Sequence, residues 1–281
     1  MAIFRHPKLL ARAYLTILRM SKGRGAQTLA RLDAALLPMR RSVELDLGVA
    51  IELAPDPHFF GYLLKTHETH IRDWILELAP DAKAFFDVGA NIGYFTGWAI
   101  SRLPTGSTVC LLEPDLENFQ ATAWTEPVAA ARGIQLCRFH DAASDRSGEI
   151  FLNRHPRFST YHSVSTYALP GDTSSVRISA VTLTDLLASC GLRNIDCLKV
   201  DVEGHEGSVL RGAAKLFREH RIGSAMIEIA PGPGAQVAFE LGRRADYSLH
   251  FWSAGRWHTW NHPTQITQRL DVRLDAVNKR L

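Results

Sequence analysis

The chain has 281 residues, of which 46% are hydrophobic and 22% are charged, a composition typical of a globular protein and not of a disordered one. The net charge of +3 is uneven, because residues 1–41 hold nine basic residues and one acidic residue, a net +8, which leaves −5 for the rest. An acidic body argues against a nucleic-acid partner, and no apolar run reaches the roughly 18 residues that span a bilayer.

The four cysteines suggest a reducing environment. None belongs to a CxxC pair, which argues against a zinc site. Three of them lie in apolar runs typical of strands, where cysteine acts as a small hydrophobic residue. The N-terminus lacks a signal-peptide pattern, since Arg12 and Arg19 interrupt its apolar residues. We therefore expect a cytoplasmic protein, with peripheral membrane contact as an alternative.

Residues 1–80 are predicted to form a helical extension and lead-in. Apolar residues recur at helical spacing over residues 9–18, while the arginines fall largely on other faces. Such a segment suits contact with an anionic membrane surface, or packing on the domain or on a second subunit of a homodimer. We favour packing because the apolar stripe is short. A strand is predicted over residues 43–53 and a helix over residues 62–78.

Residues 81–281 are predicted to form one α/β domain. Short apolar runs alternate with helical stretches, which indicates a doubly wound, mostly parallel sheet. Residues 247–252 and 256–260 flank Ser253-Ala254-Gly255 and predict a C-terminal antiparallel hairpin. An insertion at about 149–180 breaks the rhythm with two strand-like pieces around a polar, aromatic-rich loop. A loop of this length is typically a lid, a binding loop or a disordered segment.

A glycine-rich turn follows the first of these strands. Asp87 ends the strand, and Gly89, Asn91 and Gly93 supply small or turn-tolerant positions where the backbone can approach a ligand. The turn is not the dinucleotide GxGxxG pattern. Asp87 instead suits a ligand with a cationic amino-acid portion, contacted directly or through water.

Two further acids end the next strands. Glu113 follows the second strand, where a carboxylate can accept hydrogen bonds from a ribose diol. Asp141 ends the third, where an adenine N–H group would lie. Each acid alone is usually a solvated cap, but the series in order favours a nucleoside-bearing cofactor at the carboxyl edge of the sheet.

A second dense group of polar residues spans residues 199–206. Asp201, Glu203 and Lys199 are predicted to share one face of a strand by its period of two. Glu228 ends the following strand and, with Glu203, is expected to contact an acceptor.

His205 is the leading candidate for a general base because imidazole titrates near neutral pH. The alternatives are a helix-start histidine without a chemical role, and Asp201 as the base or as the group that orients the acceptor. The acids could also hold Mg²⁺, but no spacing demands it, and we expect no metal.

The inserted loop is a candidate acceptor-binding element. Arg157, Tyr161 and His162 fall between the third and fourth strands, above the carboxyl edge of the sheet. Aromatic and basic side chains suit stacking on sugar rings or pairing with an acidic group. The alternative is a surface loop without a recognition role.

Five segments resemble the FkbM-type methyltransferases: FFDVGANIGYFT, LEPD, AASDRSGEI, VTLTDLL and IDCLKVDVEGHEGSVLRGA. The resemblance implies a class I, Rossmann-like methyltransferase fold, S-adenosyl-L-methionine as cofactor and transfer to a hydroxyl oxygen. The implied acceptors are sugars, glycans, glycolipids or polyketide-like natural products, as free small molecules or lipid-linked. Gly89, Asn91 and Gly93 match the cofactor loop, Glu113 matches the ribose acid, and Asp201, Glu203, Gly204 and Glu206 match the late motif.

Two other functions stay open. One is a methyltransferase acting on protein or RNA, which is disfavoured because the late motif is not the Asn/Asp-Pro-Pro-aromatic signature of base methylation. The other is a non-catalytic scaffold that keeps the fold, which the intact glycine and acid positions argue against.

Overall fold

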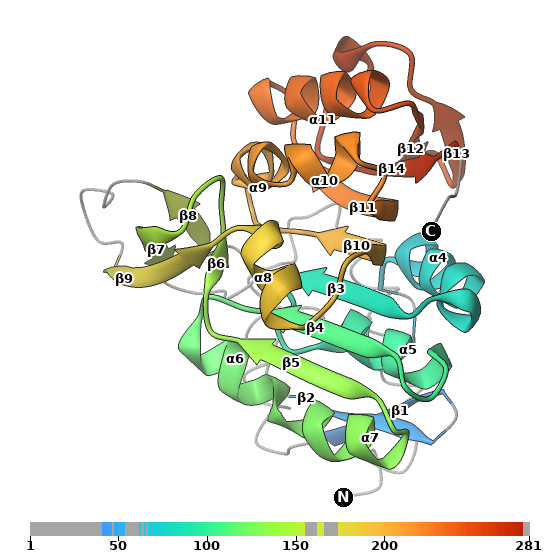
Figure 1. Cartoon of the computed structure of the whole chain (residues 1–281), viewed down its shortest axis with the longest axis vertical. Coiled ribbons are helices and arrows are strands. Elements are labelled where there is room, and N and C mark those ends of the chain that lie inside the picture. The colour runs from blue at the N-terminus through green and yellow to red at the C-terminus, as the bar shows by residue number, and fades with distance from the viewer. Residues whose placement is uncertain are drawn as a thin grey trace, which may run out of the picture.

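An eight-stranded mixed sheet runs through the middle of the molecule (Figure 1). The computed structural model describes residues 41–46, 48–53, 62, 65, 67–154, 162–165 and 174–277, so the basic N-terminal segment, Arg157 and Tyr161 lie outside the described residues. In sheet order the strands are β13 (Arg256–Thr259), β12 (Tyr247–Ser253), β14 (Leu270–Ala276), β11 (Ile222–Ile229), β10 (Ile195–Val200), β3 (Ala84–Val88), β4 (Thr108–Leu112) and β5 (Gln135–Phe139).

The parallel part of the sheet confirms the predicted doubly wound α/β fold. Strands β3, β4, β5, β10 and β11 are mutually parallel and, numbered by chain order, lie in the order 3-2-1-4-5. The direction of winding reverses between β3 and β10. In open sheets of this kind, ligands bind outside the carboxyl ends of the strands near the reversal.

Helices cover both faces because neighbouring strand residues point to opposite sides. Phe86 packs in a core with α8 (Leu183–Ser189), α9 (Glu206–Gly212), α10 (Ala214–Arg218) and α11 (Pro233–Arg244). Phe85 packs on the other side with α4 (Thr69–Leu78), α5 (Tyr94–Arg102) and α7 (Thr125–Ala131). The other helices in the described part of the chain are α6 (Leu116–Ala121) and the 3₁₀ turns η2 (Ala79–Asp81), η3 (Thr122–Trp124) and η5 (Pro263–Gln265). No described helix is long and apolar enough to cross a bilayer.

The C-terminal strands follow the prediction in part. The hairpin β12–β13 is confirmed, with Ser253 opposite Arg256 and the left-handed pair Ala254 and Gly255 forming its two-residue turn. Strand β14 is not predicted, although its Leu270, Val272 and Leu274 alternate as a half-buried strand should. It inserts antiparallel between β11 and β12.

The described part of the lead-in has strand and then helix, as predicted, but with different bounds. Residues 41–53 form an antiparallel hairpin of β1 (Arg41–Asp46) and β2 (Val49–Leu53), not one strand, because Gly48 turns the chain with a φ of 79°. The predicted helix over residues 62–78 is interrupted by left-handed backbone at Lys65 and Glu68, so α4 itself covers Thr69–Leu78.

The predicted insertion contains a second, smaller sheet. Its strands are β6 (Ala142–Ala143), β9 (Ser174–Val181), β7 (Gly148–Arg154) and β8 (Ser163–Ser165), in that spatial order. The two strand-like pieces of the prediction correspond to β7 and β9, and β8 is an addition. This inserted sheet lies beyond the carboxyl ends of β3, β4 and β5 (Figure 1).

Candidate active site

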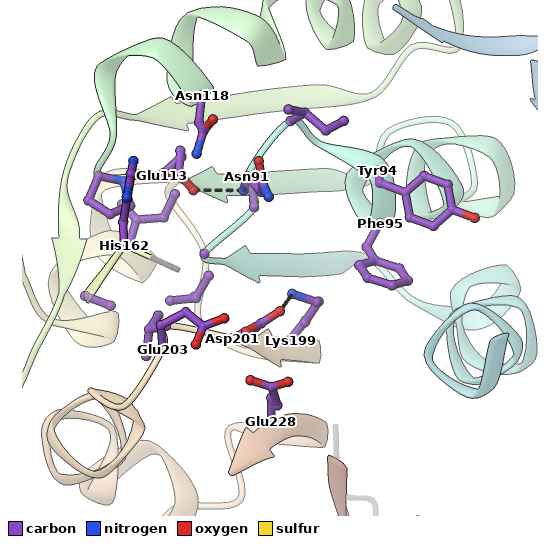
Figure 2. A pocket seen from close by; sticks show the side chains of 18 of the residues that line it. Asn91, Tyr94, Phe95, Glu113, Asn118, His162, Lys199, Asp201, Glu203 and Glu228 are labelled. Carbon is purple, nitrogen blue, oxygen red and sulfur yellow. Dashed lines mark hydrogen bonds and ion pairs between the residues drawn. The ribbon is translucent and has the colours of Figure 1, made fainter. Parts of the chain in front are cut away.

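A cavity of about 520 Å³ lies at the carboxyl ends of β3, β4, β10 and β11. Figure 2 shows its two ends. We call the part lined by Glu113, Asn118 and His162 the Glu113 end, and the part lined by Asp201, Glu203 and Glu228 the carboxylate end. The cavity therefore occupies the edge of the sheet that the sequence predicts for ligand binding.

The glycine turn forms the wall between these ends. Gly89 has a φ of 78°, and a Cβ atom there would lie 1.8 Å from the backbone oxygen of Asp201. Only glycine allows this approach between the ends of β3 and β10. Asn91 is also left-handed, with a φ of 51°, and both residues line the cavity. Gly93 begins α5 with a φ of 83° and does not line the cavity.

Asp87 lies behind the wall and not on it. Its side chain is fully buried, accepts a 2.6 Å hydrogen bond from the Thr96 hydroxyl and lies 3.8 Å from Lys199 Nζ. Burial raises the pKa of Asp87, and Lys199 opposes that rise. In this arrangement Asp87 holds Lys199 in place, and the direct ligand contact that the sequence suggests is not available.

Glu113 is held by the backbone. Its Oε2 accepts the N–H of Asn91 at 2.8 Å and its Oε1 accepts the N–H of Asp115 at 2.9 Å. Burial raises the pKa of Glu113 to about 7, although these two hydrogen bonds favour the ionised form. The Asn118 side chain also donates a hydrogen bond to Glu113, and the carboxylate lines the cavity.

Three carboxylates meet at the other end. Oxygen atoms of Asp201, Glu203 and Glu228 lie within 4.8 Å of one another. Strand β10 ends at Val200, so Asp201 and Glu203 face the cavity from a turn and not through the strand period. Glu203 adopts a left-handed φ of 51° in that turn.

Two cations neutralise part of this charge. Lys199 Nζ is buried and lies 3.2 Å from Asp201 Oδ2. Arg269 contacts Glu203 and lies 2.8 Å from Glu228 Oε2. Burial opposes the charge of Lys199, but Asp201 and Asp87 raise its pKa above the ordinary value. Lys199 is thus a fixed cation that orients Asp201.

Glu228 has a raised pKa at this end of the cavity. Its pKa is raised to about 8, first by burial and then by the charge of Asp201, while Arg269 opposes the rise. Burial also raises the pKa of Glu203. Glu228 can therefore gain or lose a proton near neutral pH, as a general base must.

Several cavity residues were not predicted. Glu68 lies at the carboxylate end with a left-handed φ of 39°, and its pKa is raised by burial and then by Asp201. No sequence signal indicates it. Arg269 precedes β14, and the alternation in that strand is the signal that would have brought it to this edge. Asn118 lies in the first turn of α6, where the side chain of the N-cap residue Asp115 accepts its N–H.

His205 is not among the residues that line this cavity. It is 8% exposed, and its Nε2 lies 3.0 Å from the Ser144 hydroxyl. Burial lowers the pKa of His205. The chain turns after β10, so the histidine faces the start of the inserted sheet and not the carboxylates. His205 is therefore not placed to act as the predicted general base in this cavity.

Asp141 and His162 were predicted to contact ligands, and only His162 lines the cavity. Asp141 is partly buried and does not line the cavity, although its neighbours Ala142 and Ala143 do. His162 lines the cavity at the Glu113 end, with its Nε2 3.6 Å from Asp115 Oδ2, and its contact with an acceptor stays a prediction.

The family model and the curated relatives that match this chain are methyltransferases. A family model described as "Methyltransferase FkbM domain" matches residues 87–254. The chain is 28% identical over 172 residues to "Methyltransferase 1" of Beauveria bassiana, covering 55% of this chain and 68% of that protein. It is 28% identical over 183 residues to "Hexuronic acid methyltransferase AglP" of Haloferax volcanii, covering 65% and 70%.

Solved structures include methyltransferase FkbM from Methylobacillus flagellatus KT. It shares 17% identity with a TM-score of 0.43, over 77% of this chain and 53% of that chain. The chain therefore spans about half the length of this solved relative.

Proposed function

The chain belongs to the FkbM methyltransferase family, and we propose that it transfers a methyl group from S-adenosyl-L-methionine to a hydroxyl oxygen of a sugar, glycan, glycolipid or polyketide-like acceptor. One observation carries the proposal: the glycine turn, Glu113 and three carboxylates share one cavity. The relative from Haloferax volcanii is named a hexuronic acid methyltransferase, which supports a sugar as acceptor.

The residues of the cavity fit such a cofactor. Glu113 lines the cavity, and a carboxylate there can accept hydrogen bonds from the ribose hydroxyls. The Oδ1 atom of Asn91 is buried and has no hydrogen-bond partner among the described residues, so it can accept an N–H from a ligand. The bound cofactor supplies an electrophilic methyl group on a positively charged sulfur, which the carboxylate end complements in charge.

The chain's own part in the reaction is positioning and proton removal. Lys199 fixes Asp201 beside the cavity, where its carboxylate can accept a hydrogen bond from the acceptor hydroxyl. Burial helps to raise the pKa of Glu228 to about 8, and its carboxylate oxygen lies within 4.8 Å of that of Asp201. We therefore assign Glu228 the role of general base, which accepts the proton of the acceptor hydroxyl. This assignment replaces His205, which lies outside the cavity.

Two measurements test the proposal in order. Calorimetry should detect binding of S-adenosyl-L-methionine and S-adenosylhomocysteine, and a variant with Glu113→Ala should bind both more weakly. A transfer screen with labelled cofactor should then find product on sugars, glycolipids or polyketide-like hydroxyl compounds, and not on protein or RNA. Absence of cofactor binding, or transfer to protein or RNA alone, would contradict the proposal.

A further inference from the structure

The inserted sheet contacts the cofactor side of the cavity. Leu152 of β7, Val164 of β8 and His162 line the Glu113 end, opposite the edge at which the carboxylates gather. Figure 2 shows His162 near Glu113 and apart from Glu228. The apolar pair and the polar edges of His162 and Asn118 match a purine ring, which has apolar faces and a polar rim.

Asp115 joins this sheet to the ribose acid. The residue is 2% exposed, and its N–H donates to Glu113 Oε1. Its Oδ1 accepts the N–H groups of Glu117 and Asn118 and so caps α6. Its Oδ2 lies 2.8 Å from Arg154 Nη2 and 3.6 Å from His162 Nε2.

Strand register explains why two basic residues meet one acid. Strands β7 and β8 pair antiparallel, with Leu152 opposite Val164 and Asn153 opposite Ser163. The next positions in that register are Arg154 and His162, which therefore emerge side by side at the end of the pair. A buried carboxylate requires such partners because an unpaired buried charge is strongly unfavourable.

We infer that the inserted sheet is the wall against which the cofactor's nucleoside packs, and that Asp115, Arg154 and His162 are positioning residues for Glu113. The inference rests on the proposed function, since it specifies how that cofactor is held. It moves His162 from the acceptor, where the sequence suggests it, to the cofactor. The acceptor would then bind at the carboxylate end of the cavity.

Substitutions at this junction test the inference. Asp115→Asn keeps an oxygen that caps α6 but removes the charge that faces Arg154, and Arg154→Met removes the partner. Arg177→Met is the matched control, because Arg177 lies on β9 of the same sheet and its contacts, an exposed pair with Glu149 and the ring of Phe151, lie away from Asp115. Melting curves establish that each variant folds. His162→Gln, which changes the longer contact with Asp115 and the side chain at the cavity wall, replaces the arginine variant if that one does not fold.

The readout is calorimetric affinity for S-adenosylhomocysteine and for adenosine. We expect Asp115→Asn and Arg154→Met to weaken both ligands by the same factor, at least tenfold, while Arg154→Lys restores most of the affinity and Arg177→Met changes neither. Folded junction variants with wild-type affinity would overturn the inference, as would a loss confined to S-adenosylhomocysteine. Failure of the wild type to bind either ligand would instead overturn the proposed function and this inference with it.

Discussion

The two ends of the cavity stabilise carboxylates by different means. At the Glu113 end, backbone N–H groups of Asn91 and Asp115 hold a single acid. At the carboxylate end, the side chains of Lys199 and Arg269 share three acids. The pKa is raised at both ends, to about 7 for Glu113 and to about 8 for Glu228, mainly by burial. Fixed backbone dipoles favour the ionised form of Glu113, whereas the charge of Asp201 favours the protonated form of Glu228.

The largest expected effect lies at the carboxylate end. Glu228→Gln removes the proposed proton acceptor and should lower turnover on the acceptor found in the screen by roughly 10²–10⁴-fold. In the wild type, turnover should rise with pH through about 8, because the base acts only when ionised. The variant should lose that rise while its affinity for S-adenosyl-L-methionine stays unchanged.

Initial rates between pH 6 and 9 and calorimetry provide these measurements. Glu77→Gln is the control, since Glu77 pairs with Arg273 away from the cavity. If the Glu228 variant keeps wild-type turnover, the role of general base would pass to Asp201 or Glu68.

Gly89→Ala should damage both ends at once. A Cβ atom there would meet the Asp201 backbone at 1.8 Å with φ at 78°, so we expect a loss of about 2–4 kcal/mol in the free energy of unfolding. Gly106→Ala is the control that has backbone strain without a steric clash, because Gly106 has a φ of 82° and nothing lies within 4 Å of the added Cβ atom. Denaturant unfolding should show a smaller loss there, about 1 kcal/mol, and equal losses would refute the close approach.

At the Glu113 end, the effect should fall on binding alone. Glu113→Ala should weaken cofactor affinity by about 1–3 kcal/mol, the scale for lost charge-assisted hydrogen bonds. Isothermal titration with S-adenosylhomocysteine measures it, with the exposed neighbour Glu117→Ala as control. Unchanged affinity would remove Glu113 from the cofactor site.

His205→Ala should have a small effect. Loss of the contact with Ser144 should cost about 0.5–1.5 kcal/mol of stability, and turnover should stay within about twofold of wild type. Ser144→Ala should give a similar stability loss, and the double variant should lose little more. A hundredfold fall in turnover with normal stability would restore His205 as the base.

Chelation should have the smallest effect of all. Arg269 already contacts two of the three clustered carboxylates, so we expect EDTA to leave turnover unchanged. Restoration of an EDTA-inhibited reaction by Mg²⁺ would show that a cation, and not Arg269 alone, balances the carboxylate end.

Local sequence determined the scaffold and the cofactor edge. Apolar runs identify β3, β4, β10 and β11, because a buried parallel strand must be apolar on both faces. Strand β5 lies at the edge of the sheet and is only partly buried, so its place in the alternation of strands and helices identifies it. The glycine turn and Glu113 follow their strands directly, so their place at the carboxyl edge needs no knowledge of distant contacts. The same locality explains why the hairpin β12–β13 was predicted from a two-residue turn.

Only the tertiary structure decided which residues complete the site. Glu68 precedes α4 and Arg269 precedes β14, and each reaches the cavity because distant segments pack beside β11. His205 does not reach the carboxylate end because the turn after β10, and not the strand, sets the direction of its side chain. The backbone after β10 turns His205 toward Ser144, and the pairing of β7 with β8 brings His162 to Asp115, two outcomes that depend on long-range packing.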